Sequence, residues 1–295
     1  MFCRFLPANF FLTVGIMITR CYLEITNVCN LDCVFCPKTV RKKHRLSIEE
    51  FNILTDRLQG QIKFLYFHLM GEPFLHPLLP EFIKVARQKG FVPVLTTNGT
   101  LLSKSQEVIE ANPHKIQISL HSQEGNGRER FEDYIHEVMS FSRKAASEGI
   151  LVVLRLWNQG GYDKENDYIH NLIEKHQPRP WTVRPDGWKL KENLYIEYDR
   201  MFEWPDSEQA EFQGKDVFCY ALRNQIGVLV DGSVVPCCLD HDGDITLGNL
   251  FYQSLDEILS SPRAKALYDG FTQHTATEWL CRRCGYAMVT KRYRE

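Results

Sequence analysis

The chain has 295 residues, of which 44% are hydrophobic and 24% charged, and its formal net charge is −2. This length allows one large α/β domain or a barrel with a small appendage. The near-neutral charge gives no electrostatic reason to expect nucleic acid or a membrane surface as the main partner.

Residues 1–16 are mostly apolar and precede Met17, which would be a natural start. They contain a single basic residue, are interrupted by Pro7 and offer no small-residue cleavage site, so they do not form a convincing signal peptide. The run is also too short to span a bilayer comfortably. We expect an extension that is disordered or that reflects a misassigned start.

Strand and helix patterns alternate from residue 21 onward. Short apolar runs predict strands at residues 21–26, 63–69, 92–97, 115–120 and 150–157. Helical patterns at 47–58, 79–89, 103–111 and 131–147 lie between them, the first opening with a capping box at Ser47. A sixth unit is a helix at 163–176 followed by a strand at 181–184. The alternation indicates parallel βαβ units, with functional residues at the carboxyl ends of the strands.

The ten cysteines are mostly clustered. Clustered thiols are typical of metal sites in a reducing compartment rather than of a disulfide framework, so we expect a cytoplasmic protein. Cys29, Cys33 and Cys36 follow the first predicted strand. Thiolates are the ligands that soft metals and iron–sulfur clusters prefer, and three of them leave one position open on a four-iron cluster.

This CxxxCxxC spacing, with Phe35 before the last cysteine, resembles the radical S-adenosylmethionine (SAM) superfamily. The resemblance implies a partial (β/α)6 TIM-like barrel over residues 17–184. It also implies a [4Fe-4S] cluster on the three cysteines, whose open iron is chelated by the amino and carboxylate groups of SAM. A zinc knuckle completed by His44 or Asp32 is the alternative.

The second strand ends in H-L-M-G-E-P, which resembles the GGEP motif of this family with Met70 in place of the first glycine. The polar residues that the resemblance assigns to SAM binding are Gly71, Glu72, Asn98, Ser119, Arg155 and Asn158. Asn98-Gly99 could instead be an ordinary turn. Arg155 lies among aliphatic residues and must pair with an anion, which could be the SAM carboxylate or a protein carboxylate.

The C-terminal part contains a second group of cysteines. Asp231-Gly232 predicts a hairpin turn, and a helical stretch covers residues 254–268. Four thiols could close a second site: Cys219, Cys237, Cys281 and Cys284. Their arrangement resembles the SPASM and twitch extensions of radical SAM enzymes, which implies an auxiliary [4Fe-4S] cluster in residues 216–295, joined to the barrel by a bridging segment at 185–215. A four-cysteine zinc site is the alternative.

Cys238 is an additional thiol beside Cys237. Neighbouring side chains on a strand point in opposite directions, so the two are not expected to bind one cluster. Cys238 is a candidate catalytic hydrogen donor to a substrate radical, or else a small buried hydrophobe.

The resemblance implies an oxidoreductase that reductively cleaves SAM to a 5′-deoxyadenosyl radical, abstracts a substrate hydrogen and passes the second electron to the auxiliary cluster. The layout is similar to that of deoxy-scyllo-inosamine dehydrogenase. Expected partners are a low-potential electron donor such as flavodoxin or ferredoxin and a small-molecule or peptide substrate, with no membrane and no nucleic acid. The alternatives are a maturase or epimerase of a ribosomal peptide and a non-catalytic zinc-binding module.

Overall fold

A computed structural model describes residues 18–102, 105–124, 130–161, 163–205 and 217–287. These residues build one 11-stranded sheet in the order β11-β10-β9-β1-β2-β3-β4-β5-β8-β7-β6. The expectation for residues 1–16 concerns a segment outside the described residues. No helix in the described ranges is long and apolar enough to cross a membrane.

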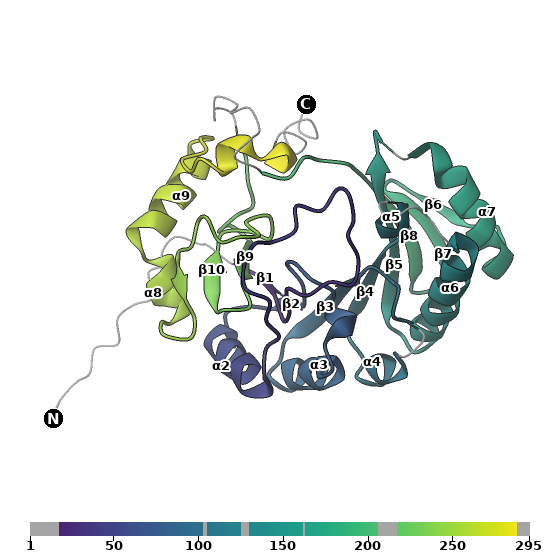
Figure 1. Cartoon of the computed structure of the whole chain (residues 1–295), viewed down its shortest axis with the longest axis horizontal. Coiled ribbons are helices and arrows are strands. Elements are labelled where there is room, and N and C mark those ends of the chain that lie inside the picture. Colours follow the sequence, from purple (N-terminus) through teal and green to yellow (C-terminus); the bar gives the residue numbers. More distant parts are fainter. Residues whose placement is uncertain (1–17, 103–104, 125–129, 162, 206–216, 288–295) are drawn as a thin grey trace.

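The centre of the sheet consists of six parallel strands: β1 (Arg20–Leu23), β2 (Phe64–Tyr66), β3 (Val92–Thr97), β4 (Lys115–Ser119), β5 (Leu151–Gln159) and β8 (Leu194–Arg200). The connecting helices are α2 (Ile48–Leu58), α3 (Leu79–Gln88), α4 (Gln106–Glu110), α6 (Phe131–Ser147) and α7 (Asn166–His176). The strands form an open arc with these helices along its outside (Figure 1). This is an α/β partial barrel, as expected.

The helices form where local capping and apolar spacing agree. Ser47 accepts a hydrogen bond from the Glu50 backbone, and the Glu50 side chain accepts one from the Ser47 backbone, so the predicted capping box is present. Phe51 on α2 stacks on Phe82 on α3, with ring centroids 4.2 Å apart. The outer helices therefore pack on each other as well as on the sheet.

The prediction that the sixth parallel strand lies at residues 181–184 was wrong. Residues Thr182–Arg184 do form a strand, β6, but it is the exposed edge of an antiparallel extension with β7 (Gly187–Lys191). The sixth parallel strand is β8, which alternates buried Leu194 and Ile196 with partly exposed residues. The segment 185–215, expected to bridge two domains, thus contributes two strands to the sheet.

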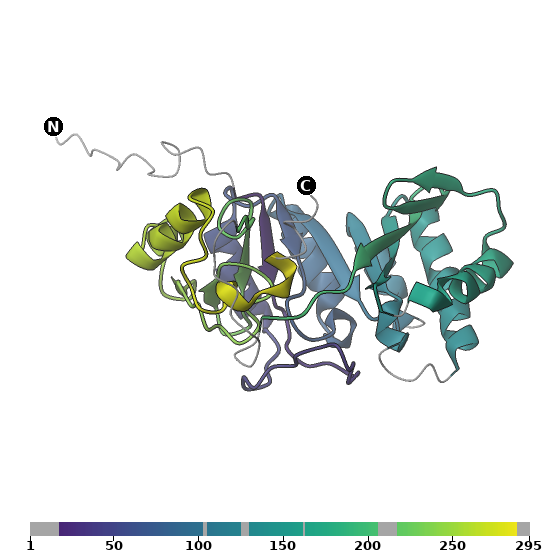
Figure 2. The same cartoon turned by 90° about the horizontal axis from the view of Figure 1, so that it is seen from above.

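The C-terminal segment continues the same sheet on the other side of β1. Strand β9 (Gln225–Val228) pairs in parallel with β1, and β10 (Ser233–Val235) and β11 (Gly248–Asn249) follow in antiparallel order. The hairpin at Asp231-Gly232 is present, with Gly232 at φ +82°, but residues 229–232 connect its strands, so the loop is longer than the two-residue turn that the sequence predicts. Figure 2 shows the C-terminal helices and the β6–β7 extension at opposite ends of the sheet.

The single helix expected over 254–268 is two helices, α8 (Leu255–Leu259) and α9 (Pro262–Thr272). Proline lacks the backbone N–H that a continuous helix needs, so it starts a new helix at its first position. The shorter elements are η1 (Pro73–Leu75), α5 (His121–Glu124), η3 (Asp163–Glu165) and η4 (Cys281–Arg283).

Candidate functional site

The loop between β1 and α2 carries Cys29, Cys33 and Cys36 at the carboxyl end of β1. In Figure 1 this purple loop crosses the concave side of the arc, and in Figure 2 it projects from one edge of the sheet. The Cys36 N–H donates to the Cys33 carbonyl at 3.1 Å, so these two residues share one tight turn. None of the three cysteines forms a disulfide bond within the described ranges.

Asn98, at the end of β3, ties this loop to the sheet. Its Nδ2 donates to Asn30 Oδ1 at 3.0 Å and lies 4.0 Å from Cys29 Sγ. Its Oδ1 accepts from the Thr100 N–H at 3.0 Å, which is the local contact of a turn. Asn98 therefore forms the turn considered from the sequence, and it also lies beside the first cysteine.

The Met70–Glu72 turn packs directly against the start of the cysteine loop. Gly71 has φ +76°, and a Cβ atom there would lie 2.3 Å from the Thr26 carbonyl oxygen. The Glu72 N–H donates to the Val28 carbonyl at 2.9 Å. A glycine is required here both for its backbone conformation and for the close approach of two chain segments.

Replacing Gly71 with alanine is expected to lower the free energy of unfolding more than replacing Gly90 does. Gly90 also has a positive φ, +88°, but a Cβ atom added there would have no atom within 4 Å. The left-handed backbone alone costs roughly 1–2 kcal/mol for a residue with a side chain, and the backbone clash adds to it only at Gly71. Urea unfolding of the two variants measures this, and equal losses would contradict it.

Glu72 is 2% exposed and already accepts three hydrogen bonds. Its Oε1 accepts from Thr97 Oγ1 at 2.7 Å and from the Phe74 N–H at 3.0 Å, and Oε2 accepts from the Asn98 N–H at 2.7 Å. Burial raises the pKa of this carboxyl to about 7, against the opposing effect of those bonds. A carboxylate has about four acceptor positions, so room for one further donor remains.

A central cavity of about 470 Å³ is lined by residues of the parallel strands and of the segments that follow β2, β4 and β8. Ser119, Arg155 and Asn158 line it, whereas Gly71, Glu72 and Asn98 do not. The six residues predicted to bind the cofactor therefore form two groups, one beneath the cysteine loop and one on the cavity wall.

Arg155 stands between Ser119 on β4 and Glu197 on β8 in the strand register. Its guanidinium lies 3.3 Å from the centroid of the Trp157 ring, and its Nε makes no hydrogen bond to a described residue. Burial lowers its pKa to about 10, so it remains a cation at neutral pH. A buried cation on a cavity wall can attract an anionic group. The Asn158 amide, in contrast, is bonded to the Asn166 side chain at 2.8 Å.

Sequence reasoning missed several residues of the cavity wall. These are polar or aromatic positions that alternate with buried apolar ones along the strands: Tyr22, Tyr66, His68, Gln117, Trp157, Glu197 and Asp199. Burial lowers the pKa of His68 to about 3 and that of His121 to about 4, so both imidazoles are neutral. The period of two was visible in the sequence and would have identified the inward-facing side chains.

A second cavity, of about 400 Å³, gathers the C-terminal thiols. It is lined by Cys219, Cys237, Cys281 and Cys284, the four residues predicted to hold an auxiliary cluster, and by Cys238. Burial raises the pKa of all four predicted ligands. They are therefore protonated in the metal-free protein, and metal binding would release their protons.

Cys238 lines both cavities, as do Tyr22 and Trp157. The argument from strand geometry does not apply to Cys237 and Cys238, because both lie beyond the end of β10 and both reach the second cavity. Only Cys238 also reaches the central one. Burial raises its pKa to about 12, so it carries its hydrogen at neutral pH.

No three His, Cys, Asp or Glu side chains among the described residues are grouped closely enough to hold one metal ion. The three N-terminal thiols instead lie along one loop, and the C-terminal thiols line one cavity. Several soft donors spread around one space suit a multi-iron cluster, and the chemistry of both donor sets fits such a group.

Two family models match the chain. The model of the Radical SAM superfamily matches residues 23–173, and the model of an iron–sulfur cluster-binding domain, SPASM, matches residues 219–285. Together they cover both groups of cysteines.

Among curated proteins, the chain is similar to the antilisterial bacteriocin subtilosin biosynthesis protein AlbA of Bacillus subtilis, with 24% identity over 289 residues, 85% of this chain and 62% of AlbA. It is also similar to GTP 3′,8-cyclase of Chlorobaculum tepidum, with 28% identity over 174 residues, 55% of this chain and 51% of the cyclase. The chain thus spans less than two thirds of the length of these relatives.

Among solved structures, BtrN in complex with AdoMet and 2-DOIA has a TM-score of 0.58 at 17% identity, covering 90% of this chain and 92% of BtrN. The enzyme anSMEcpe with bound AdoMet has a TM-score of 0.61 at 13% identity, covering 84% and 79%. At these identities the likeness establishes the fold.

Proposed function

The chain belongs to the radical SAM superfamily, and from this premise we propose that it is an oxidoreductase that takes a hydrogen atom and then an electron from a substrate in the central cavity. It is an enzyme whose cofactors are a [4Fe-4S] cluster with SAM and a further iron–sulfur cluster in the SPASM domain. The finer assignments below are proposals.

Cys29, Cys33 and Cys36 would hold the first cluster, because they share one loop at the carboxyl end of β1. The auxiliary cluster, a second [4Fe-4S], would be held by the four cysteines that line the second cavity. When bound, these groups supply a 5′-deoxyadenosyl radical that removes a substrate hydrogen and an acceptor for the second electron. A low-potential donor such as flavodoxin or ferredoxin would provide the initial electron.

The residues of the chain would bind and orient SAM and the substrate. Glu72 has one acceptor position left for the SAM ammonium, and Asn98 lies beside Cys29. Arg155 and Ser119 line the cavity, where the guanidinium of Arg155 supplies a positive charge for a carboxylate. Oxidation of an alcohol or amine also releases a proton, and Glu197 and Asp199 place carboxylates on the same wall.

The observation that carries the proposal is the wall shared by the two cavities. Tyr22, Trp157 and Cys238 line both, so a substrate in the central cavity would lie next to the four-thiol site. This arrangement supports a two-electron oxidation. The test is anaerobic incubation of reconstituted enzyme with SAM, dithionite and small alcohols, amines or peptides. Formation of 5′-deoxyadenosine with an oxidised product is expected, and the absence of an oxidised product with every substrate would contradict the proposal.

SAM binding is expected to weaken as the pH falls through about 7. The pKa of Glu72 is raised to about 7, so below that pH the carboxyl is protonated and cannot accept from the ammonium as an anion. The apparent Kd at pH 6 should be about ten-fold higher than at pH 8, since only the ionised fraction binds. Titration of SAM by electron paramagnetic resonance measures it. The Glu72→Gln variant should lack this pH step and corrects for ionisation of SAM itself.

Peptide modification is the second candidate. It is favoured by the match to AlbA along 85% of this chain and by Cys238, a partly buried protonated thiol on the wall of the central cavity. If the enzyme is an epimerase, reaction in D₂O should place solvent deuterium in the product, and Cys238→Ala should abolish this while 5′-deoxyadenosine still forms. Cys21→Ala, in a buried strand position, is the control. An oxidised product without deuterium would favour the oxidoreductase.

A cytoplasmic location is part of the same proposal. None of the nine cysteines in the described ranges forms a disulfide bond there, which agrees with a reducing compartment.

A further inference from the structure

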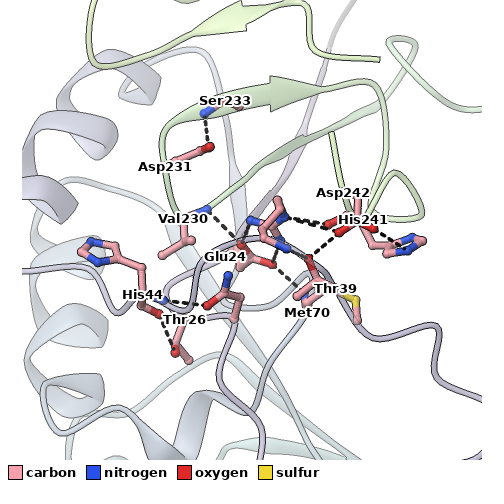
Figure 3. A network of polar contacts seen from close by, with 12 residues as sticks. Glu24, Thr26, Thr39, His44, Met70, Val230, Asp231, Ser233, His241 and Asp242 are labelled. Atoms are coloured by element: carbon pink, nitrogen blue, oxygen red, sulfur yellow. Dashed lines mark hydrogen bonds and ion pairs between the residues drawn. The ribbon is translucent and has the colours of Figure 1, made fainter. Parts of the chain in front are cut away.

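A buried carboxylate joins three segments that are far apart in the sequence. Glu24, the residue after β1, is 0% exposed. Its Oε1 accepts from the Met70 N–H at 3.2 Å, and its Oε2 accepts from the Val230 N–H at 2.9 Å. Figure 3 shows Glu24 between Met70 and Val230. One side chain thus holds both the turn that precedes Glu72 and the hairpin of the SPASM region.

Arg41 supplies the countercharge. Its Nη1 and Nη2 donate to Oε2 and Oε1 of Glu24 at 2.8 and 2.6 Å, which is a bidentate pairing that only arginine can make. Its Nε donates to the His241 carbonyl at 2.9 Å. His241 follows Cys237 and Cys238 by a few residues, so Arg41 links the three-cysteine side to the four-cysteine side.

Arg41 belongs to the return segment, residues 37–45, which leads from Cys36 back to α2. Asp242 holds this segment a second time, because it accepts from Thr39 Oγ1 and from the Val40 N–H, the latter at 3.2 Å. Figure 3 shows Thr39, His241 and Asp242 close together. The SPASM region is therefore attached to the return segment as well as to strand β1.

We propose that Glu24 and Arg41 are positioning residues that make SAM binding depend on the docked SPASM region. Glu24 fixes Met70, the next residue is Gly71, and Glu72 follows with the acceptor proposed for the SAM ammonium. Arg41 fixes the return segment behind Cys36. The pair holds both halves of the SAM site at once: Glu24 attaches the first half to the hairpin at Val230, and Arg41 attaches the second to the loop after Cys238.

The inference rests on the proposed function, because it takes the Glu72 turn and the three-cysteine loop as the SAM site. It goes further in assigning the SPASM hairpin a role in shaping that site. A pair with only local structural importance would affect stability without affecting SAM binding.

The experiment compares reconstituted holoenzymes of wild type, Arg41→Met, Arg41→Lys and Lys89→Met. Lys89 is a matched control: its side chain is 16% exposed against 13% for Arg41, and it ties α2 and α3 together through Asp56 and Thr55, away from both cysteine loops. Iron content, thermal midpoint and the SAM dissociation constant are measured for each. The dipolar interaction between the two reduced clusters is recorded by pulsed paramagnetic resonance.

We expect Arg41→Met to bind SAM about ten-fold more weakly than wild type and to alter the inter-cluster dipolar signal. Arg41→Lys keeps the charge but loses the paired donors, so a loss of about three-fold is expected even if the methionine variant does not fold. Lys89→Met should lower the thermal midpoint and should leave the SAM dissociation constant within about two-fold of the wild-type value.

The inference is overturned if the folded Arg41 variants bind SAM as wild type does, or if Lys89→Met weakens binding as much as they do. Failure of the proposed function would give a different result. The wild-type protein itself would then not hold both clusters, or it would not bind SAM.

Discussion

The simultaneous replacement of Cys29, Cys33 and Cys36 by alanine is expected to reduce 5′-deoxyadenosine formation to the level of an enzyme-free control. The three thiols share the loop beneath which Gly71 and Glu72 lie, so removing them removes the proposed ligands of the SAM-binding cluster. About half of the iron should remain, because the four other thiols line a separate cavity. Iron analysis and chromatography of the reaction products measure both effects.

Cys21→Ala is the control for this experiment. Cys21 is fully buried in β1 and lines neither cavity, so the variant should keep both clusters and should still cleave SAM. Continued 5′-deoxyadenosine formation by the triple variant would contradict the site assignment. Wild-type protein that is colourless and holds zinc instead of iron would support the alternative of a zinc-binding module.

The replacement of Cys281 and Cys284 by alanine is expected to separate SAM cleavage from product formation. Both line the second cavity and neither lines the central one. The variant should lose about half of its iron, should still release 5′-deoxyadenosine in the presence of dithionite, and should form no oxidised product. The ratio of product to 5′-deoxyadenosine, close to one for a coupled enzyme, is the quantity to measure.

A matched change in the same cavity helps to interpret this result. Phe271→Leu alters the apolar lining and leaves every thiol in place, so the ratio should stay at its wild-type value. If the double cysteine variant forms oxidised product at the wild-type ratio, the four-thiol site does not take the second electron and the oxidoreductase proposal fails.

Much of the fold could be predicted because local signals agree with it. The predicted helix at 131–147 and strand at 92–97 have the observed bounds of α6 and β3. In both, apolar periodicity and flanking turn residues indicate the same element. The cysteine spacing then identified the family without any structural knowledge, since the motif is local in the sequence.

The sixth parallel strand was harder to predict because its sequence is polar. Strand β8 reads L-Y-I-E-Y-D-R, and its acidic residues face the cavity rather than the apolar core. Apolar content alone favoured Trp181–Arg184, whose strand residues are all exposed in the structure. Position in the sheet depends on pairing with β5, which is a non-local property.

The sequence could predict only part of the candidate site. Motifs name candidate residues directly, whereas Glu24 lies within a predicted apolar strand and Arg41 within a basic run at residues 38–45, a pattern typical of solvated surface. Their role depends on two long-range contacts. Glu24 and Arg41 are 17 positions apart in the sequence, and Glu24 and Val230 are 206 positions apart. No periodicity or spacing within a short window contains that information.

The parallel pairing of β9 with β1 has a consequence for synthesis of the protein. Arg20 leaves the ribosome early, but its partner Gln225 follows roughly 10–40 s later at ordinary elongation rates. During that interval one edge of the first strand has unpaired amide and carbonyl groups, which is a template for unwanted association between nascent chains. Co-expression of chaperones should therefore improve the yield of this enzyme even before iron supply becomes limiting.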